Sequence, residues 1–199
     1  MSGSEKIVQD LVAAGVPVRD VWDLVNTSKQ YRQAIPVLIR WLEHLEAWSE
    51  PSERRSLEEG IVRSLTVPAA RGVATPVLIK RFRDTAYDTA HRWVIGNALG
   101  VVADSSFYDE IMPIVTEPGY GIARQMIVEG LAKWKDPRTV PVLIDLLSDP
   151  DVAAHAAHAL GLLRAKEARG ALIQLGSNGS VLQRREARTA LRRLSPGDG

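Results

Sequence analysis

Residues 136–164, DPRTVPVLIDLLSDPDVAAHAAHALGLLR, carry the pattern of two short helices joined by a tight turn. Apolar residues recur at spacings of three and four on both sides of Asp149, Pro150 and Asp151, which predicts one apolar stripe on each helix. The stripes consist of Val140, Leu143, Ile144 and Leu147, and of Val152, Ala156, Ala159, Leu160 and Leu163. We expect the two stripes to face each other in a helical hairpin.

The ends of these two helices carry their own signals. Asp136 is expected to cap the first helix with its carboxylate, and Pro137 suits the first helical position. Pro141 is expected to kink this helix or shift its start, because proline has no N–H to donate. Asp151 is expected to cap the second helix. Neither helix is long enough to be stable alone, so neighbouring copies must supply further contacts.

Looser copies of the first helix recur along the chain, each marked by a proline or its replacement. These positions, which are 40, 37, 28 and 29 residues apart, are Pro36, Pro76, Pro113, Pro141 and Gly170. The spacing predicts an internal repeat with insertions in its first half. One insertion, at residues 43–50, is expected to lengthen a first helix, and another, at residues 65–76, is expected to form a loop.

The second helices are predicted at residues 52–65, 88–102, 121–134, 151–163 and 181–194. We align them on an apolar anchor that each contains: Ile61, Leu99, Leu131, Leu160 and Leu191. The position four residues before the anchor then forms a shared column that is predicted to be buried. Its members are Leu57, Ile95, Ile127, Ala156 and Ala187.

These patterns predict a single all-α domain over residues 1–199, built as an α-solenoid of about five hairpins over residues 31–194. Residues 1–30 are expected to form an N-terminal cap from helices at residues 4–14 and 18–25, and residues 195–199 to be a frayed tail. The residues of the cap that are expected to face inward are Val8, Leu11, Val12, Val21, Trp22 and Val25. Trp41 and Trp134 are predicted to be core residues.

The composition of the chain argues against several classes of partner and chemistry. The net charge of +1 on 199 residues gives no support from totals alone to a nucleic-acid or membrane partner. The chain has no cysteine, which excludes disulfides and thiolate chemistry. The N-terminus lacks the pattern of a signal peptide and no long apolar run follows, so a cytoplasmic location is expected. We expect a monomer without a cofactor, and without a nucleotide-binding loop.

The pattern of DPRTVPVLIDLLSDPDV followed by AAHALGLL resembles the HEAT-like repeats named after phycobilisome lyases. The resemblance implies a right-handed superhelix of helix pairs, whose second helices line an inner face that grips other proteins. Deoxyhypusine hydroxylases share this kind of fold and carry His-Glu pairs, which this chain lacks. Alkylpurine DNA glycosylases of the HEAT-like type use a strongly basic face, whereas this chain is nearly neutral. No bilin-attachment residues can be mapped.

The candidate partner-binding residues lie on the second helices. One column of the alignment contains Arg54, Arg92, Arg124 and Arg184, with Ala153 breaking it. These arginines are expected either to bind phosphates or acidic peptides, or to pair with the acidic turn residue of their own or the next repeat. Trp93 occupies a column of otherwise polar or small residues, so it either anchors a partner or packs against the loop at residues 65–76. The full set of candidates is Arg92, Trp93, Asn97, Arg124, Glu129, His158, Arg184, Arg185 and Arg188.

Two alternatives to protein binding have their own residues. Asp151, His155 and His158 share one face of a predicted helix, as a metal site requires, although structural or solvated roles explain them better. The last helix carries Arg184, Arg185, Arg188, Arg192 and Arg193, which makes nucleic-acid binding or DNA repair the rival function. No catalytic residue is assigned, and a non-enzymatic scaffold is the preferred function.

Overall fold

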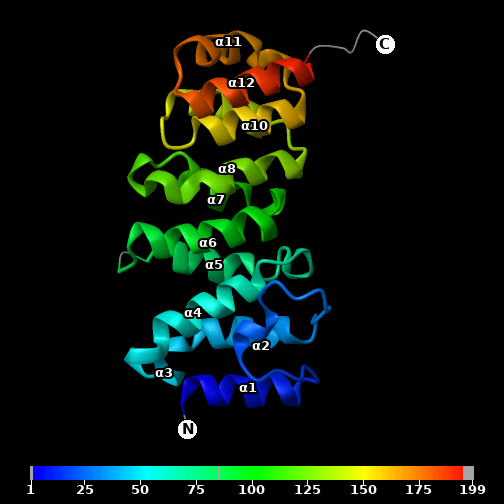
Figure 1. Ribbon diagram of the computed structural model, residues 1–199, viewed down its shortest axis with the longest axis vertical. Coiled ribbons are helices and arrows are strands. Elements are labelled where there is room, and N and C mark those ends of the chain that lie inside the picture. Colours follow the sequence, from blue (N-terminus) through cyan, green and yellow to red (C-terminus); the bar gives the residue numbers. More distant parts are fainter. Residues whose placement is uncertain (1, 85, 195–199) are drawn as a thin grey trace. The chain divides into compact units, whose positions relative to one another are not determined.

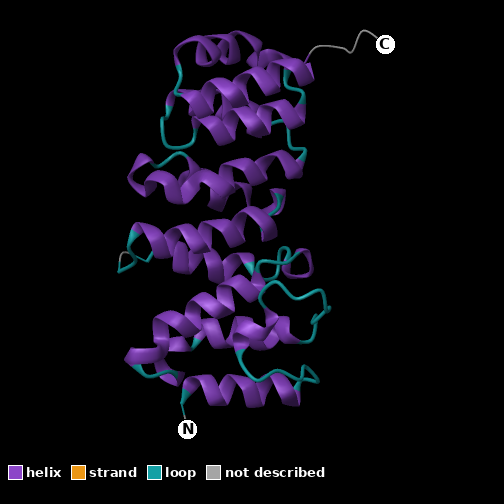
Figure 2. Cartoon of the chain, in the orientation of Figure 1, coloured by secondary structure: helices purple, strands orange, loops and turns teal. Residues whose placement is uncertain are grey.

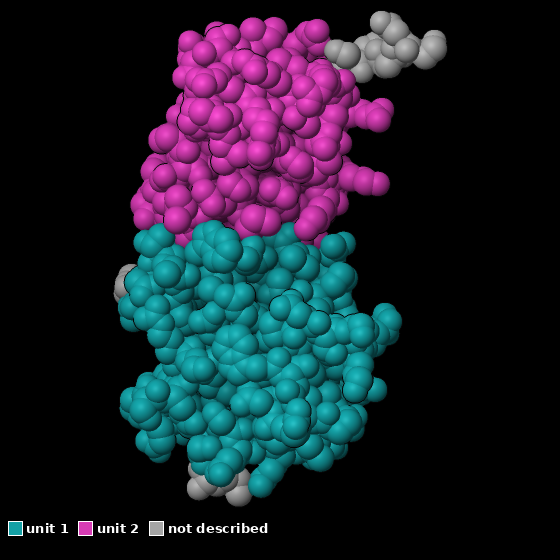
Figure 3. Space-filling view, in the orientation of Figure 1, with its two compact units in different colours: residues 1–102 teal, residues 103–199 magenta. Residues whose placement is uncertain are grey.

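The computed structural model describes residues 2–84 and 86–194, and every regular element within these residues is a helix (Figures 1 and 2). The predicted all-α class is therefore confirmed for this part of the chain, and the arrangement is consistent with an α-solenoid. The chain separates into two compact units, residues 1–102 and residues 103–199 (Figure 3). The tail at residues 195–199, predicted to fray, lies outside the described residues.

Unit 1 contains a helical N-terminal segment and two hairpins. Its elements are α1 (Gly3–Ala13), η1 (Val21–Leu24), α2 (Ala34–Glu43), α3 (Leu45–Trp48), α4 (Pro51–Leu65), η2 (Pro68–Ala70), α5 (Thr75–Phe82) and α6 (Thr89–Val102). The second helix α4 packs against both α2 and α6, and α5 packs against α6. The insertion at residues 43–50 does not simply lengthen a first helix, because α2 ends at Glu43 and a separate short helix, α3, follows.

The N-terminal segment buries fewer residues than the sequence predicts. Ser2 and Glu5 form a capping box at the start of α1, where Ile7 and Leu11 are buried but Val12 is 51% exposed. Residues 18–25 form only the 3₁₀ helix η1, whose three-residue turn buries Val21 and Leu24 on one side. Trp22 is consequently 39% exposed, so the predictions that Val12 and Trp22 face inward are wrong.

Gly60 allows η1 to approach α4 closely. A Cβ atom added to Gly60 would lie 2.7 Å from Cγ1 of Val21 and 3.1 Å from Nε1 of Trp22. The Ser64 hydroxyl, one turn later, donates to the carbonyls of Gly60 and Val21. The N-terminal segment is therefore fixed to a second helix of the repeat.

Unit 2 contains three hairpins. Its elements are η3 (Ser105–Phe107), α7 (Tyr108–Val115), η4 (Pro118–Arg124), α8 (Gln125–Gly130), η5 (Leu131–Trp134), α9 (Thr139–Asp145), η6 (Leu146–Ser148), α10 (Ala153–Leu163), η7 (Lys166–Ala168), α11 (Arg169–Asn178) and α12 (Val181–Leu194). The second helices α8, α10 and α12 follow one another in space in the order of the chain, and α10 packs against both α8 and α12 (Figure 1).

The hairpin at residues 136–164 forms, but its caps differ from those predicted. Helix α9 begins at Thr139, and the Asp136 carboxylate accepts from the N–H of Arg138 rather than from the helix. Helix α10 begins at Ala153, and the carboxylate of Asp149 accepts from the N–H of Asp151. The two aspartates thus shape the turns that precede the helices, so the cap roles predicted for Asp136 and Asp151 are wrong.

The marker prolines do not share one helical position. Pro36, Pro76 and Pro141 lie in the first turns of α2, α5 and α9, where a missing N–H removes no helical hydrogen bond. Pro113 instead lies inside α7, which begins earlier, at Tyr108. A prediction that places Pro113 in the first turn therefore starts this helix too late in the sequence.

The column of apolar residues that aligns the second helices is buried as predicted. All five members, Leu57, Ile95, Ile127, Ala156 and Ala187, are at most 3% exposed. In unit 2 helices α10 and α12 also approach closely, because a Cβ atom added to Gly161 of α10 would lie 2.8 Å from Cα of Ala190 in α12. Trp41 is buried as predicted, whereas Trp134 is only partly buried and its indole donates to the carbonyl of Ala103.

Glycine-to-alanine substitutions should therefore have opposite effects in two helices of unit 2. Alanine usually stabilises a helix relative to glycine by about 1 kcal/mol. Gly170→Ala in α11 should follow this rule, because its added Cβ meets no atom within 4 Å. Gly161→Ala should instead lower the free energy of unfolding by about 1–3 kcal/mol, since α10 and α12 must separate. Urea denaturation of both variants tests the packing, and equal effects would contradict it.

Candidate functional site

The arginine column of the second helices binds the ends of the first helices. Arg54 donates to the carbonyls of Glu46 and Ser49, at the end of α3. Arg92 donates to the carbonyls of Phe82 and Asp84, at the end of α5. Arg184 donates to the carbonyl of Gly179, which ends α11. These carbonyls have no partner within their own helices, so each guanidinium closes its hairpin.

Arg124 makes the same contact from a completely buried position. Its side chain is 0% exposed and donates to the carbonyls of Val115 at 2.9 Å and Gly121 at 3.0 Å. Its Nη2 atom donates to the carboxylate of Asp149, in the turn of the next repeat, at 2.8 Å. Arg124 therefore has no surface to offer a partner, and it joins two successive repeats of unit 2.

Removal of the Arg124 side chain should be strongly destabilising. Arg124→Ala leaves carbonyls and the Asp149 carboxylate without their buried donor, a type of loss that costs about 3–5 kcal/mol. Arg55→Ala is the matched control, because it breaks an exposed ion pair with Asp88 and should leave stability within error. Urea denaturation measures both. Similar losses in the two variants would contradict the structural role of Arg124.

The accessible part of the second helices in unit 1 includes Trp93 and Asn97, which lie one turn apart on α6 and are both half-buried. Asn97 also borders a hollow of about 220 Å³, together with Arg63 of α4 and residues 24–27 of the N-terminal segment. Helix α6 thus presents a large aromatic and an amide beside a cavity, which is a combination suited to binding.

A buried polar cluster in unit 1 was missed by the sequence analysis. Glu58 of α4 is 3% exposed and accepts from the hydroxyl of Tyr87 at 2.5 Å. Nε2 of His91 lies 3.2 Å from Oε2 of Glu58 without the geometry of a hydrogen bond. Arg81 lies 3.7 Å from Glu58 and also donates to Glu46 and to the carbonyl of Leu42. Burial and the nearby Glu58 carboxylate raise the pKa of Tyr87, so this phenol stays protonated.

The alignment contained a signal for this cluster. Glu58 occupies the position three residues before the anchor, which the next three second helices fill with the buried residues Gly96, Val128 and Ala157. A carboxylate in such a column requires buried donors. The identity of those donors could not be read from the sequence, because they come from α5, α6 and the loop between them.

In unit 2, the corresponding face carries charged and titratable groups. Glu129 of α8 and His158 of α10 occupy the same column as Asn97, two residues before the anchor, and both are half-buried. Nδ1 of His158 lies 3.4 Å from the carboxylate of Glu186 in α12. Glu186 also pairs with Arg185 at 2.9 Å. A chain of polar groups therefore crosses the packed helices α10 and α12.

Residues 108–192 match the family model of HEAT repeats. This match and the all-helical structure support a HEAT-like repeat for the corresponding hairpins. The subdivision named after phycobilisome lyases is not distinguished by it. No curated protein matches the chain. No helix of the described residues is long and apolar enough to cross a membrane.

The hairpin at residues 136–164 does not assemble the metal site considered from its sequence. Asp151 precedes α10, and its carbonyl accepts from the side chain of Gln125, whereas His155 and His158 lie within the helix. Within residues 2–84 and 86–194, no group of three or more His, Cys, Asp or Glu side chains is placed to hold a metal ion. The shared helical face therefore does not bring the three side chains together.

The arginines of the last second helix, α12, are partly engaged within the protein. Arg184 donates to the end of α11, Arg185 pairs with Glu186, and Arg192 donates to the hydroxyl of Thr189. Arg188 and Arg192 occupy columns that hold buried residues in the earlier second helices, yet both are exposed on α12. Helix α12 therefore presents arginines at positions that are packed in the earlier second helices.

His155 lies between the two acidic groups of this face. Burial lowers its pKa, while the charges of Glu129 and Glu186 oppose this effect and His158 adds to it. Its Nδ1 atom is buried without a hydrogen-bond partner among the described residues. The folded protein thus holds His155 in its neutral form at a pH where the unfolded chain binds a proton.

The stability of unit 2 should consequently fall as the pH is lowered. A histidine whose pKa is lowered by folding contributes to the free energy of unfolding. This contribution is complete above the ordinary pKa of 6.5 and is lost as the pH falls through 6.5 toward the pKa of the folded state. The free energy of unfolding should therefore decrease from pH 7 to pH 5, and His155→Gln should reduce this decrease. His44→Gln, at an exposed position, is the control that should retain it. Parallel pH profiles for His155→Gln and the unsubstituted protein would exclude this effect.

Proposed function

We propose that this protein is a non-enzymatic scaffold that binds another protein through the exposed face of its second helices. The observation that carries the proposal is the equivalent placement of half-buried polar residues in α6, α8 and α10. Asn97, Glu129 and His158 occupy one column of the repeat, where they combine packing with accessible polar groups. HEAT repeats generally serve as protein-interaction scaffolds, which agrees with this use of the face.

The proposed contact surface consists of Trp93, Asn97, Glu129, His158, Arg185 and Arg188. Trp93 is its proposed anchor, because aromatic residues supply much of the binding energy at protein interfaces. Arg92, Arg124 and Arg184 are left out, since their guanidinium groups donate to backbone carbonyls and Arg124 has no exposed surface. We further propose that the hairpins of residues 31–194 form one right-handed solenoid of the phycobilisome lyase type.

Trp93→Ala should weaken partner capture without unfolding the protein. Loss of an interface anchor costs about 2 kcal/mol or more, which corresponds to roughly 30-fold in affinity. The measurement uses a photo-crosslinking amino acid at Asn97 or Glu129 to trap the partner in cells, followed by an affinity measurement with the purified pair. Arg92 is kept unchanged, because its removal would also release the end of α5.

Matched controls carry the same crosslinker at Lys80 and Asp145, which are exposed on the first helices α5 and α9. The second-helix positions should trap one protein in common, and the first-helix positions should not. Equal trapping from both sets, or an unchanged affinity of Trp93→Ala, would contradict the proposed surface.

A further inference from the structure

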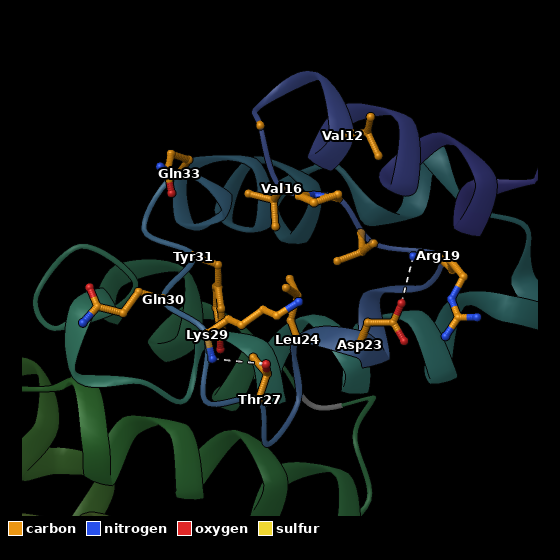
Figure 4. Close-up of a pocket in the computed structure, with 13 residues that line it drawn as sticks. Val12, Val16, Arg19, Asp23, Leu24, Thr27, Lys29, Gln30, Tyr31 and Gln33 are labelled. Carbon is orange, nitrogen blue, oxygen red and sulfur yellow. Dashed lines mark hydrogen bonds between the residues drawn. The ribbon is translucent and has the colours of Figure 1, made fainter.

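A cavity lies in the N-terminal segment, and none of its lining residues belongs to the proposed partner surface. It has a volume of about 630 Å³ and is bounded by the end of α1 and by residues 15–33 (Figure 4). Cavities that bind small molecules commonly measure about 300–1,000 Å³. Gly15, at a φ of +81°, turns the chain at the edge of this cavity, and no atom lies within 4 Å of where its Cβ would be.

One wall of the cavity is apolar and incompletely covered. Val12 lines it while being 51% exposed, and Val16 and Leu24 supply buried surface beside it. Tyr31 is held in the wall, because its hydroxyl donates to the carbonyl of Ser64 at 2.9 Å. Exposure of apolar surface in a concave site favours a ligand with an apolar body.

Two cations, Arg19 and Lys29, and one carboxylate, Asp23, line the cavity. The carboxylate of Asp23 accepts from the backbone N–H groups of Arg19 and Asp20, and these bonds together with the charge of Arg19 lower its pKa. Asp23 and Arg19 therefore lie together at one end of the cavity, where the backbone of Arg19 holds the carboxylate (Figure 4). The side chain of Lys29 extends across the cavity toward Leu24, and among the described residues no acidic group forms an ion pair with it (Figure 4).

From this arrangement we propose that the cavity between α1 and residues 15–33 binds a small anion with an apolar body, such as a medium-chain carboxylate. The apolar part lies against Val12, Val16 and Leu24, and the carboxylate pairs with the ammonium group of Lys29. This placement covers exposed apolar surface and neutralises the unpaired cation in one step. The proposal does not depend on the protein-binding function.

The test titrates octanoate into the full-length protein by calorimetry, with octylammonium and octan-1-ol as probes of equal chain length. Octanoate should bind saturably at one site, and octylammonium should bind at least about tenfold more weakly. Lys29→Gln should weaken octanoate binding by about tenfold, whereas Lys29→Arg should retain it. Val12→Trp, at a half-exposed position, should fill the cavity and abolish binding.

Lys6→Gln is the matched control, because Lys6 is an exposed lysine of α1 that does not line the cavity. Circular dichroism confirms that each variant is folded before titration. Absence of saturable octanoate binding, equal affinity for octanoate and octylammonium, or an equal effect of Lys29→Gln and Lys6→Gln would each overturn the proposal.

Discussion

The first helices of this protein are short, and the carbonyl groups at their ends need partners from outside the helix. Arg54, Arg92, Arg124 and Arg184 supply these partners from the second helices of four hairpins. In each of these hairpins, one side chain thus joins the second helix to the end of the segment before it. Arg124 also binds Asp149 of the following repeat, so it joins two hairpins as well as the two helices of its own.

Departures from the repeat pattern mark positions with additional roles. Glu58 stands where the next three second helices have small or apolar buried residues, and it organises Tyr87, His91 and Arg81 around a buried carboxylate. Burying such a charge is costly unless all of its partners are present, so this cluster specifies how the two hairpins of unit 1 meet. Trp93 departs from its column in another way, since it places a half-buried aromatic side chain where the other second helices have polar or small residues.

The N-terminal segment combines attachment with incomplete packing. Gly60 and Ser64 hold η1 against α4, whereas the chain on either side of η1 leaves an open cavity beneath α1. Its short 3₁₀ turn buries Val21 and Leu24 against the second helix and leaves Trp22 on the other side. Val12 is likewise 51% exposed at the end of α1, where it lines the cavity.

The sequence by itself determined the helical class, the second helices and their buried column from Leu57 to Ala187, because helical periodicity places such residues on one face wherever the helix packs. The starts of the first helices, the inward residues of the cap and the donors around Glu58 were decided only by the tertiary structure. The same is true of the backbone carbonyls that Arg92, Arg124 and Arg184 bind, whereas the pairing of Arg124 with Asp149 of the next repeat agrees with one of the two expectations from the sequence. The physical reason is that these features depend on where backbone carbonyls and side chains of different helices meet, and no local pattern encodes that distance.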